Sequence, residues 1–439
     1  TTMISVILVA SIALAVVLGY KTNINTGFFC IAFAFLIGCF GLGISTKSLI
    51  GFWPTSTMFV ILSVSLFYNF AAVNGTLEKL SSSLLYACRS FPGLLPFALF
   101  FVAVVLSVIG AAYFTVLAFL APITLVICDE ARMDKLTGAV AINCGALAGG
   151  NFPTAALGVV FRGLMDTAYE ANPSLEAVDS FSAELKIFGF AIVFSIILIA
   201  VFRYGFKENR NIGKGITFKK PEPFDEKQKK TLTLMLLMMA VVLVFPLLNM
   251  ILPGNSFISA ISSKVDVGLV AICFTVIALL MNLAPQKEVI ARVPWNTIIM
   301  IAGAGMLIAV AVEAGTIEAL SAWIGSNVPV ALVPIAFSLV AAFMSFFSST
   351  TGVVTPALFP LIPALAQSTG LDATVLFACT VLGAQSSAIS PFSSGGSLIL
   401  GSCGKEEERN ILFNRLLFVA VPISVICSAV YNVVVAMVL

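Results

Sequence analysis

Histidine is absent from the 439 residues of this chain, and charged residues make up only 10% of them. A soluble globular domain carries about 25% charged residues. Here 60% of the residues are hydrophobic, and the mean hydropathy is +1.09. The composition therefore predicts a polytopic membrane protein, and its net charge of +2 gives no reason to expect a nucleic-acid partner.

Other absences narrow the chemistry. The lack of histidine removes the commonest metal ligand and the side chain that ordinarily titrates near neutral pH. The nine cysteines are scattered through apolar stretches without metal or disulfide spacing, so we interpret them as small buried hydrophobes. No phosphate-binding loop with its lysine is present. Enzymatic catalysis, ATP-driven pumping and a resident cofactor are therefore not expected.

Long apolar runs predict the membrane-spanning helices. A helix needs about 20 apolar residues to cross a bilayer. Full-length candidates are 3–20, 26–43, 55–74, 185–204, 231–252, 266–283, 296–314 and 412–438. No acidic residue falls in the middle of these runs, which disfavours a proton relay built from intramembrane carboxylates.

Four further apolar segments are interrupted. Segment 94–128 is cut near Gly110, and segment 329–367 is cut at 348–352. Two short apolar halves joined by a small-residue turn favour a re-entrant helical hairpin over two full spans with a tight turn. Each hairpin precedes a broken helix, 134–167 with its break at 149–153 and 370–400 with its break at 385–396. Such backbone at membrane depth must line a cavity enclosed by protein.

The interruptions belong to an internal repeat. The motif GTLEKL at 75–80 recurs as GTIEAL at 315–320, which is 240 residues further along the chain. Six identities follow at a spacing of 238: Ser107 and Ser345, Pro122 and Pro360, Asp134 and Asp372, Gly145 and Gly383, Ala146 and Ala384, Pro153 and Pro391. Between equivalent points the chain crosses the membrane an odd number of times, so the repeats are expected to be inverted. Paired, interrupted segments of this kind point to a secondary transporter.

Charge distribution predicts the topology. The expected divisions are an N-terminal half at 1–204, a cytoplasmic linker at 205–230 and a C-terminal half at 231–439. The linker holds eight basic residues against four acidic ones, whereas loop 168–184 holds Glu170, Glu176, Asp179 and Glu184 with no Lys or Arg. The positive-inside rule then places the N-terminus outside a plasma or inner membrane that the chain crosses several times.

The interruptions supply four strips of polar, uncharged residues as a candidate site. They are the first tip (Ser107, Gly110, Ala111, Ala112, Tyr113, Thr115), the first break (Gly149, Gly150, Asn151, Thr154), the second tip (Ser348, Ser349, Thr350, Thr351) and the second break (Gln385, Ser386, Ser387, Ser390, Ser393, Ser394). Hydroxyls, amides and half-helix N-termini suit an anion, and exposed carbonyls suit a small cation. Small polar residues also pack helices in membranes, which is the alternative for each one alone. Arg162 is expected either to reach the outer interface or to attract the anion.

These stretches resemble a known family. The order of spans, hairpin, broken helix and basic linker, followed by a second hairpin and broken helix, is similar to the ion-transporter superfamily. The motifs IGAA at 109–112, LAPI at 120–123 and GALAGGNFP at 145–153 resemble the bacterial malonate/dicarboxylate carriers. The resemblance implies a homodimer with a scaffold domain and an elevator-like transport domain. It also implies a dicarboxylate between the two tips, and often sodium beside each tip.

The same resemblance assigns individual residues. Divalent-anion/sodium symporters carry a Ser-Asn-Thr motif in each tip, for which Ser348-Ser349-Thr350 stands here, and Ser390-Pro391 stands for a substrate-contacting Thr-Pro. The first tip departs from this pattern, because Gly110-Ala111-Ala112 and Phe152-Pro153 replace its motifs. The predicted substrate-binding set is Gly110, Ala111, Thr115, Gly150, Asn151, Thr154, Ser348, Ser349, Thr350, Ser390, Pro391 and Ser393. The predicted sodium set is Ser348, Thr350, Thr351, Gln385 and Ser386.

The leading hypothesis is a secondary carrier of a small dicarboxylate of the malonate or C4 type. It is expected to be sodium-coupled or an exchanger. Two alternatives stay open. One is a cation/proton or oxyanion antiporter of the same fold, which needs intramembrane carboxylates. The other is the membrane subunit of a binding-protein-dependent transporter.

Overall fold

The computed structural model describes residues 2–22, 24–53, 55–90, 92–212, 220–252, 254–293, 295–347, 350–391, 393–403 and 405–438. Within these ranges all regular secondary structure is helical, which confirms the all-α class. Two residues of the second predicted tip, Ser348 and Ser349, lie outside the described ranges, as does part of the basic linker, 213–219.

The first part of the chain, up to the linker, forms ten α-helices with short flanking turns. They are α1 (Thr2–Thr22), α2 (Thr26–Phe35) with the π-helical turn η1 (Leu36–Gly41), α3 (Thr46–Gly51), α4 (Thr55–Val73), α5 (Thr76–Ala87) with η2 (Cys88–Ser90), η3 (Pro92–Leu94), α6 (Leu95–Val108), α7 (Tyr113–Ala131), α8 (Lys135–Gly150), α9 (Ala156–Glu170), α10 (Ser180–Gly205) and η4 (Lys207–Asn211).

The rest of the chain follows a comparable order. Its elements are α11 (Glu226–Ile251), α12 (Ser256–Ser262), α13 (Val267–Leu280), α14 (Gln286–Ala291), α15 (Trp295–Glu313), α16 (Thr316–Asn327), η5 (Val330–Leu332), α17 (Val333–Phe347), η6 (Thr350–Val354), α18 (Thr355–Leu358), η7 (Phe359–Leu361), α19 (Ile362–Thr369), α20 (Ala373–Ser386), α21 (Ser394–Gly401), α22 (Glu406–Arg415), η8 (Leu416–Ala420) and α23 (Val421–Val438).

Aspartates at equivalent positions begin the two broken helices. The Asp134 carboxylate accepts a hydrogen bond from the Leu136 backbone N–H at 3.3 Å, and Asp372 accepts one from Thr374 at 2.6 Å. A side-chain acceptor at this position satisfies one of the N–H groups that the first helical turn leaves without a partner. The two aspartates matched in the sequence repeat therefore set the start of α8 and of α20.

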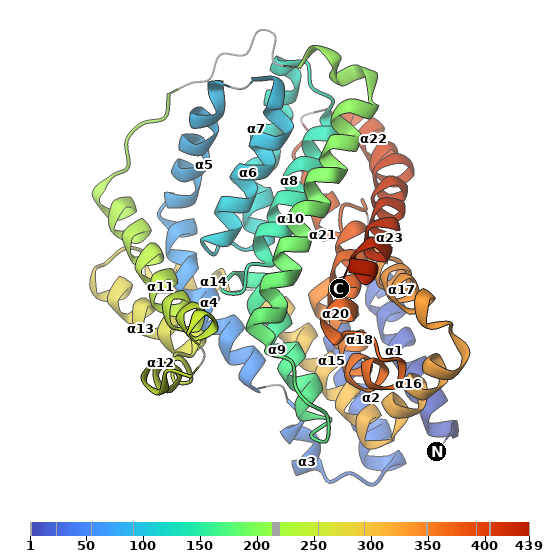
Figure 1. Ribbon diagram of the computed structural model, residues 1–439. Coiled ribbons are helices and arrows are strands. Elements are labelled where there is room, and N and C mark those ends of the chain that lie inside the picture. Colours follow the sequence, from blue (N-terminus) through green and yellow to red (C-terminus); the bar gives the residue numbers. More distant parts are fainter. Residues whose placement is uncertain are drawn as a thin grey trace.

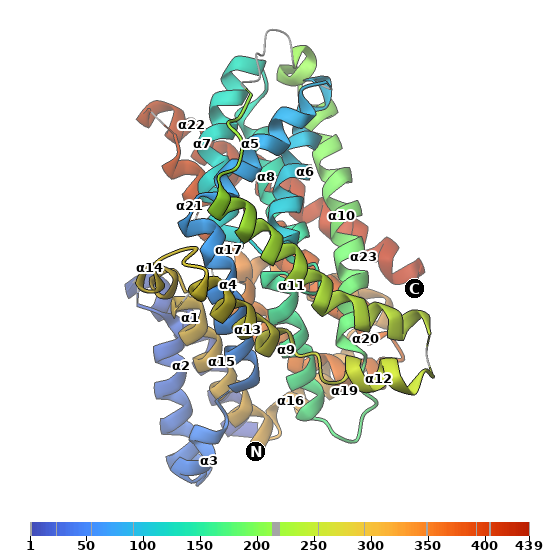
Figure 2. The ribbon, with the colours of Figure 1, turned by 90° about the vertical axis from the view of Figure 1, so that its left-hand side faces the viewer.

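The two predicted hairpins, 94–128 and 329–367, lie toward opposite ends of the molecule. Figure 1 places α6 and α7 toward one end, and α17 and α18 nearer the other. The long helix α10, green in Figure 1, runs between them. The turn η4, which follows α10, lies at the first end, and the connection from α9 to α10 lies at the second (Figures 1 and 2). Helix α2 packs on α15, and α13 packs on α4, so each half contributes to the packing of the other.

Two repeat-matched glycines let each broken helix pack tightly on the preceding helix pair. A Cβ atom on Gly145 of α8 would lie 2.5 Å from the Phe100 carbonyl oxygen of α6. A Cβ on Gly383 of α20 would lie 2.3 Å from the Ser338 carbonyl oxygen of α17. Only the absence of a side chain permits these backbones to approach so closely. The glycines thus attach α8 to α6 and α20 to α17 in the same way.

The surface suits a lipid environment. By length and composition, three described helical stretches can cross a membrane: Ser180–Gly205, Thr350–Thr369 and Glu407–Met437. Shorter apolar helices accompany them. Large apolar side chains stand exposed on several helices, among them Phe343, Phe418 and Met437. Since a water-soluble surface rarely shows many such residues together, they indicate contact with lipid.

Two expectations from the sequence need correction. The second break is shorter than predicted, because Gln385 and Ser386 still belong to the last turn of α20 and the irregular segment covers 387–393. Glu184 does not lie in an exposed acidic loop, because Asp179 caps α10 and the helix begins at Ser180. Glu184 is therefore one turn inside a candidate membrane-spanning helix, and it is 0% exposed.

Candidate functional site

The two breaks meet through a pair of amides. Asn151 follows the last residue of α8, and Gln385 lies in the last turn of α20. Asn151 Nδ2 donates to Gln385 Oε1 at 3.0 Å, and Gln385 Nε2 donates to Asn151 Oδ1 at 2.7 Å. Both side chains are buried. Residues predicted from two distant parts of the chain are therefore in direct contact at one point of the interior.

The first tip is closed by a tyrosine from another helix. Gly110 lies in the turn between α6 and α7 with φ of +110°, where residues with a side chain are strained. A Cβ at this position would lie 2.1 Å from the ring of Tyr68 in α4. Tyr68 is outside the predicted site, because nothing in the local sequence of α4 places it against the tip.

The first tip also contacts the second break. Tyr113, the first residue of α7, donates its hydroxyl hydrogen to Asn143 Oδ1 at 2.6 Å. A Cβ on Gly395 of α21 would lie 1.9 Å from the Tyr113 hydroxyl oxygen, and α7 packs on α21 along its length. Asn143 was not predicted as a site residue, because it occupies an ordinary buried position in the interior of α8.

Three buried hydroxyls near the first tip and first break have no hydrogen-bond partner. They are Tyr68 Oη, Ser107 Oγ and Thr154 Oγ1. Ser107 faces the first break, since a Cβ on Gly149 would lie 2.9 Å from the Ser107 Cβ. Buried polar groups are nearly always paired. Among the other predicted residues here, Ala111 is buried, Thr115 is half-buried, and Gly150 lies against Leu157.

Two half-helices begin beside this region without a side-chain cap. Ala112 precedes α7 and Ala155 precedes α9, and neither supplies a side-chain cap. The first N–H groups of each helix therefore depend on a partner other than a capping side chain. Together with the unpartnered Thr154 hydroxyl, they offer hydrogen-bond donors to a negatively charged ligand.

The serine hydroxyls of Ser387 and Ser393 in the second break form hydrogen bonds with backbone groups. Ser387 Oγ donates to the Ala342 carbonyl of α17 at 2.7 Å, so the break is attached to the second helix pair. Ser393 Oγ donates to the Ser390 carbonyl at 2.7 Å and accepts from the Gly396 N–H at 3.3 Å, which caps α21. Ser390 and Pro391 are buried within this segment.

The described part of the second tip is engaged within its own hairpin. Thr350 and Thr351 open the π-helical turn η6. The Ser345 and Thr350 hydroxyls lie 2.9 Å apart, and Thr355 Oγ1 donates to the Thr350 carbonyl at 3.0 Å. Ser386, predicted to share a sodium site with them, donates to the Gly383 carbonyl at 2.6 Å. The structure does not show Thr350 bonded to Gln385 or Ser386.

A small cavity, lined mostly by apolar side chains, lies beside the amide pair. It measures about 20 Å³, enough for one water molecule, and α8, α10, α20 and α23 surround it. Its polar lining consists of Asn143, Ser195, Gln385, Ser386 and Ser424. Neutral oxygens of this kind suit a water or a small hard cation. No group of three or more Cys, Asp or Glu residues gathers for a transition metal in the described ranges.

A larger cleft of about 760 Å³ opens between α4, α9, α15 and η7. Arg162 of α9 lines it, together with the acidic residues Asp166, Glu170, Asp266 and Glu313. Arg162 Nη1 donates to the Pro153 carbonyl of the first break at 3.1 Å. The arginine therefore connects the cleft to the break.

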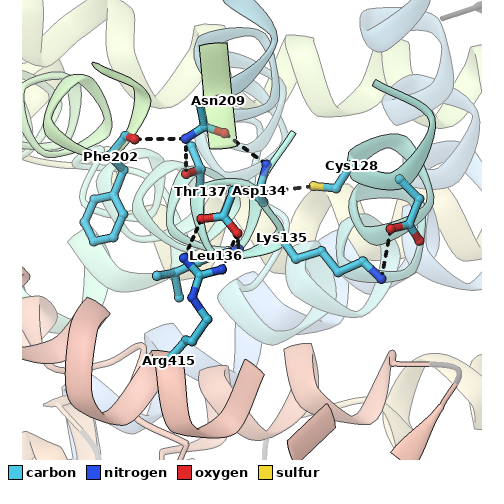
Figure 3. A network of polar contacts seen from close by, with 9 residues as sticks. Cys128, Asp134, Lys135, Leu136, Thr137, Phe202, Asn209 and Arg415 are labelled. Carbon is cyan, nitrogen blue, oxygen red and sulfur yellow. Dashed lines mark hydrogen bonds and ion pairs between the residues drawn. The ribbon is translucent and has the colours of Figure 1, made fainter. Parts of the chain in front are cut away.

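A polar network anchors the start of α8 (Figure 3). Arg415 of α22 donates to both carboxylate oxygens of Asp134, with Nη2 to Oδ2 at 2.9 Å. Asn209 of η4 accepts from the Asp134 N–H at 2.9 Å and donates to Thr137 Oγ1 at 2.8 Å. Lys135 pairs with Glu408 at 2.9 Å. The start of the linker and α22 are thus tied to the first broken helix.

Comparisons with known proteins agree with this architecture. Residues 2–150 match the family described as "Dicarboxylate carrier protein MatC N-terminus", and residues 257–439 match the family described as "Citrate transporter". No curated protein matches the chain.

Two solved structures share the fold. The Alcanivorax borkumensis YdaH transporter is 18% identical, with a TM-score of 0.61 over 88% of this chain and 87% of its own. Neisseria gonorrhoeae MtrF, from a class of antimetabolite efflux pumps, is 14% identical, with a TM-score of 0.56 over 90% of this chain and 83% of its own.

Interrupted helices that meet in a polar interior, together with the two family matches, indicate a membrane transporter. The chain is thus similar to a dicarboxylate carrier over residues 2–150 and to a citrate transporter over residues 257–439, and each match covers less than half of it.

Proposed function

We propose that this protein is a secondary active carrier of a small dicarboxylate, which binds where the two breaks meet. The observation that carries the proposal is the reciprocal amide pair between Asn151 and Gln385. It joins the two breaks in a region without fixed charge. A secondary carrier needs such a central site that both sides of the membrane can reach in turn.

Hydrogen-bond donors at this point favour an anion. The N-terminus of α9, which no side chain caps, and the unpartnered hydroxyls of Thr154 and Tyr68 are available to carboxylate oxygens. Neutral donors hold a carboxylate without a permanent counter-charge, which allows the same site to release it again. The substrate-binding set is therefore proposed to include Tyr68 and Asn143 in addition to the residues expected from the sequence.

The coupling mode is proposed as sodium symport or exchange of dicarboxylates. The small cavity beside Gln385 and Ser386 supports a sodium ion there, because five of its lining side chains, drawn from both halves of the chain, provide neutral oxygens. The first tip offers no comparable set of side chains. We therefore expect either one cation site or none, and a sodium-gradient experiment distinguishes these two outcomes.

The transport motion is proposed to be of the elevator type, in a homodimer. The moving part would contain α6–α9 and α17–α21 as two inverted repeats. The opposite placement of the two helix pairs supports this arrangement (Figure 1). The linker after α10 would face the cytoplasm, and the N-terminus would face outside.

Uptake by proteoliposomes that contain only this protein tests the proposal. Labelled malonate, succinate and citrate are offered with an inward sodium gradient, and then without sodium but with unlabelled substrate inside. Sodium-dependent uptake means symport, and uptake that needs internal substrate means exchange. No uptake of any of the three would contradict the proposed function and favour a binding-protein-dependent system.

Variants locate the site in the same assay. Ser390→Ala and Thr154→Ala each remove a hydroxyl from one break, and both are expected to lower uptake. Ser326→Ala, on the exposed surface of α16, is the matched control and should behave as the unaltered protein. Full activity of both break variants would overturn the placement of the site.

A further inference from the structure

Glu184 is a buried carboxyl group that the proposed site does not use. It is 0% exposed, and neither of its carboxylate oxygens has a hydrogen-bond partner. Ala183 and Ile187 beside it belong to an apolar cluster that includes Phe161 and Leu164 of α9. A carboxylate buried in apolar surroundings without partners loses its hydration and gains nothing in return.

The positive charge of Arg162 on α9 acts on Glu184, whereas Lys186 on α10 itself is exposed. The helices packed around α10 carry few other ionisable side chains. Helices α6, α20 and α23 contain no Asp, Glu, Lys or Arg. On α8, Lys135 pairs with Glu408 and Asp129, and η4 lies at the far end of α10. Besides Arg162, α9 contributes Asp166, Tyr169 and Glu170, and Asp179 caps α10.

Arg162 connects this carboxyl group to the cleft. It lines the 760 Å³ cleft, whereas Glu184 does not. Its guanidinium lies 5.1 Å above the Phe181 ring, and its Nε has no hydrogen-bond partner. Since the Glu184 oxygens are unpartnered, the attraction between the two side chains acts over more than a hydrogen-bond distance. Arg162 is therefore able to respond both to the charge of Glu184 and to an anion in the cleft.

We propose that Glu184 binds a proton, and that this proton and an anion in the cleft bind cooperatively through Arg162. Asp166, Glu170, Asp266 and Glu313 also line the cleft, so an ionised Glu184 adds to the negative charge around Arg162 and opposes an anion there. A protonated Glu184 removes one of these negative charges, so the anion binds more tightly. By reciprocity, a bound anion favours the proton at Glu184 by the same factor. The linkage rests on the proposed anion transport and adds a proton to its cargo.

Because the proton and the anion favour each other's binding, lowering the pH is expected to tighten anion binding. For one linked proton the change is at most about tenfold per pH unit. The last ionisation of malonate, succinate and citrate lies closer to neutral pH than that of an ordinary carboxyl group, so the substrate itself also titrates. A pH dependence of apparent KM that the unaltered protein shows and Glu184→Gln lacks therefore reports on the protein, because the substrate ionises identically in both assays.

Transport measurements test the linkage with Glu184→Gln, which resembles the protonated side chain in shape. In unaltered protein, apparent KM should fall as the pH is lowered, and uptake should acidify a liposome lumen that contains a pH-sensitive dye. In Glu184→Gln, uptake should persist with a KM independent of pH and without acidification. Glu176→Gln, at an exposed loop position, should match the unaltered protein.

Two results would overturn the inference. One is uptake by the unaltered protein without lumen acidification and with a KM independent of pH, which needs no variant and leaves the proposed carrier function intact. The other comes from infrared spectroscopy of the purified protein. The carbonyl band of a protonated carboxylic acid should be present in unaltered protein and in Glu176→Gln, and weakened in Glu184→Gln. If the band does not change, Glu184 holds no proton, whatever the protein transports.

Discussion

Asn151 and Gln385 exchange two hydrogen bonds across 234 residues of sequence. Each amide is buried, so each satisfies the other where water is excluded. A pair of this kind is sensitive to the loss of one partner, because the remaining amide is left buried and unpaired. It also joins the ends of two helices that belong to different halves of the chain.

Removal of one amide is expected to destabilise the protein. Asn151→Leu or Gln385→Leu should each lower the free energy of unfolding by about 1–3 kcal/mol. The double variant should lose less than the sum, since it leaves no unpaired amide. Thermal unfolding of the purified protein in detergent measures this. Strict additivity of the two losses would argue against a direct interaction.

Removal of the Tyr68 hydroxyl is expected to affect function and stability in opposite directions. Tyr68→Phe deletes a buried hydroxyl without a partner, so the free energy of unfolding should stay equal or rise by up to about 1 kcal/mol. Uptake should fall, because the proposed substrate loses a donor. Tyr204→Phe, at a position 69% exposed on α10, is the control and should change neither. A Tyr68→Phe variant with normal kinetics would remove Tyr68 from the site.

Gly110 is expected to accept no side chain. Gly110→Ala places a Cβ where φ is +110° and where the Tyr68 ring is only 2.1 Å away. We expect a loss of at least about 1–3 kcal/mol in stability from backbone strain, and loss of uptake. Gly189→Ala is the matched control, because nothing lies within 4 Å of that position in the interior of α10. It should stabilise the helix by up to about 1 kcal/mol.

The ion pair between Asp134 and Arg415 is expected to stabilise the contact between α8 and α22. The Asp134 side chain is 4% exposed and that of Arg415 is 29% exposed. Arg415→Gln leaves a buried carboxylate unpaired and should cost about 2–4 kcal/mol. Asp134→Asn should cost less, because asparagine still caps a helix.

The surface pair of Lys79 and Glu222 is a control for the network around Asp134. Glu222 is 90% exposed, so Glu222→Gln should change stability by less than about 1 kcal/mol. Thermal unfolding compares the three variants under one condition. An effect of Arg415→Gln no larger than that of Glu222→Gln would show that the buried pair contributes little.

The sequence alone located the interruptions of the helices, although it ended α20 too early and missed the first turn of α10. Asp134 and Asp372 start the broken helices because an aspartate caps the first turn, and Gly110 turns the first tip because glycine tolerates its φ. Apolar runs long enough to enter a bilayer determined the membrane class. These are local properties of adjacent residues, and for that reason they can be read without a structure.

Only the tertiary structure decided which distant side chains meet. Tyr68 closes a tip whose turn, Gly110-Ala111-Ala112, carries no side-chain oxygen, and Arg415 pairs with an aspartate 281 residues away. Glu184 looked like one acid of an exposed loop, yet the packing of α9 against α10 buries it completely. Helix periodicity states which face is apolar but not which helix covers that face. Contacts between helices therefore follow from the packing of the whole chain, and with them the composition of the site.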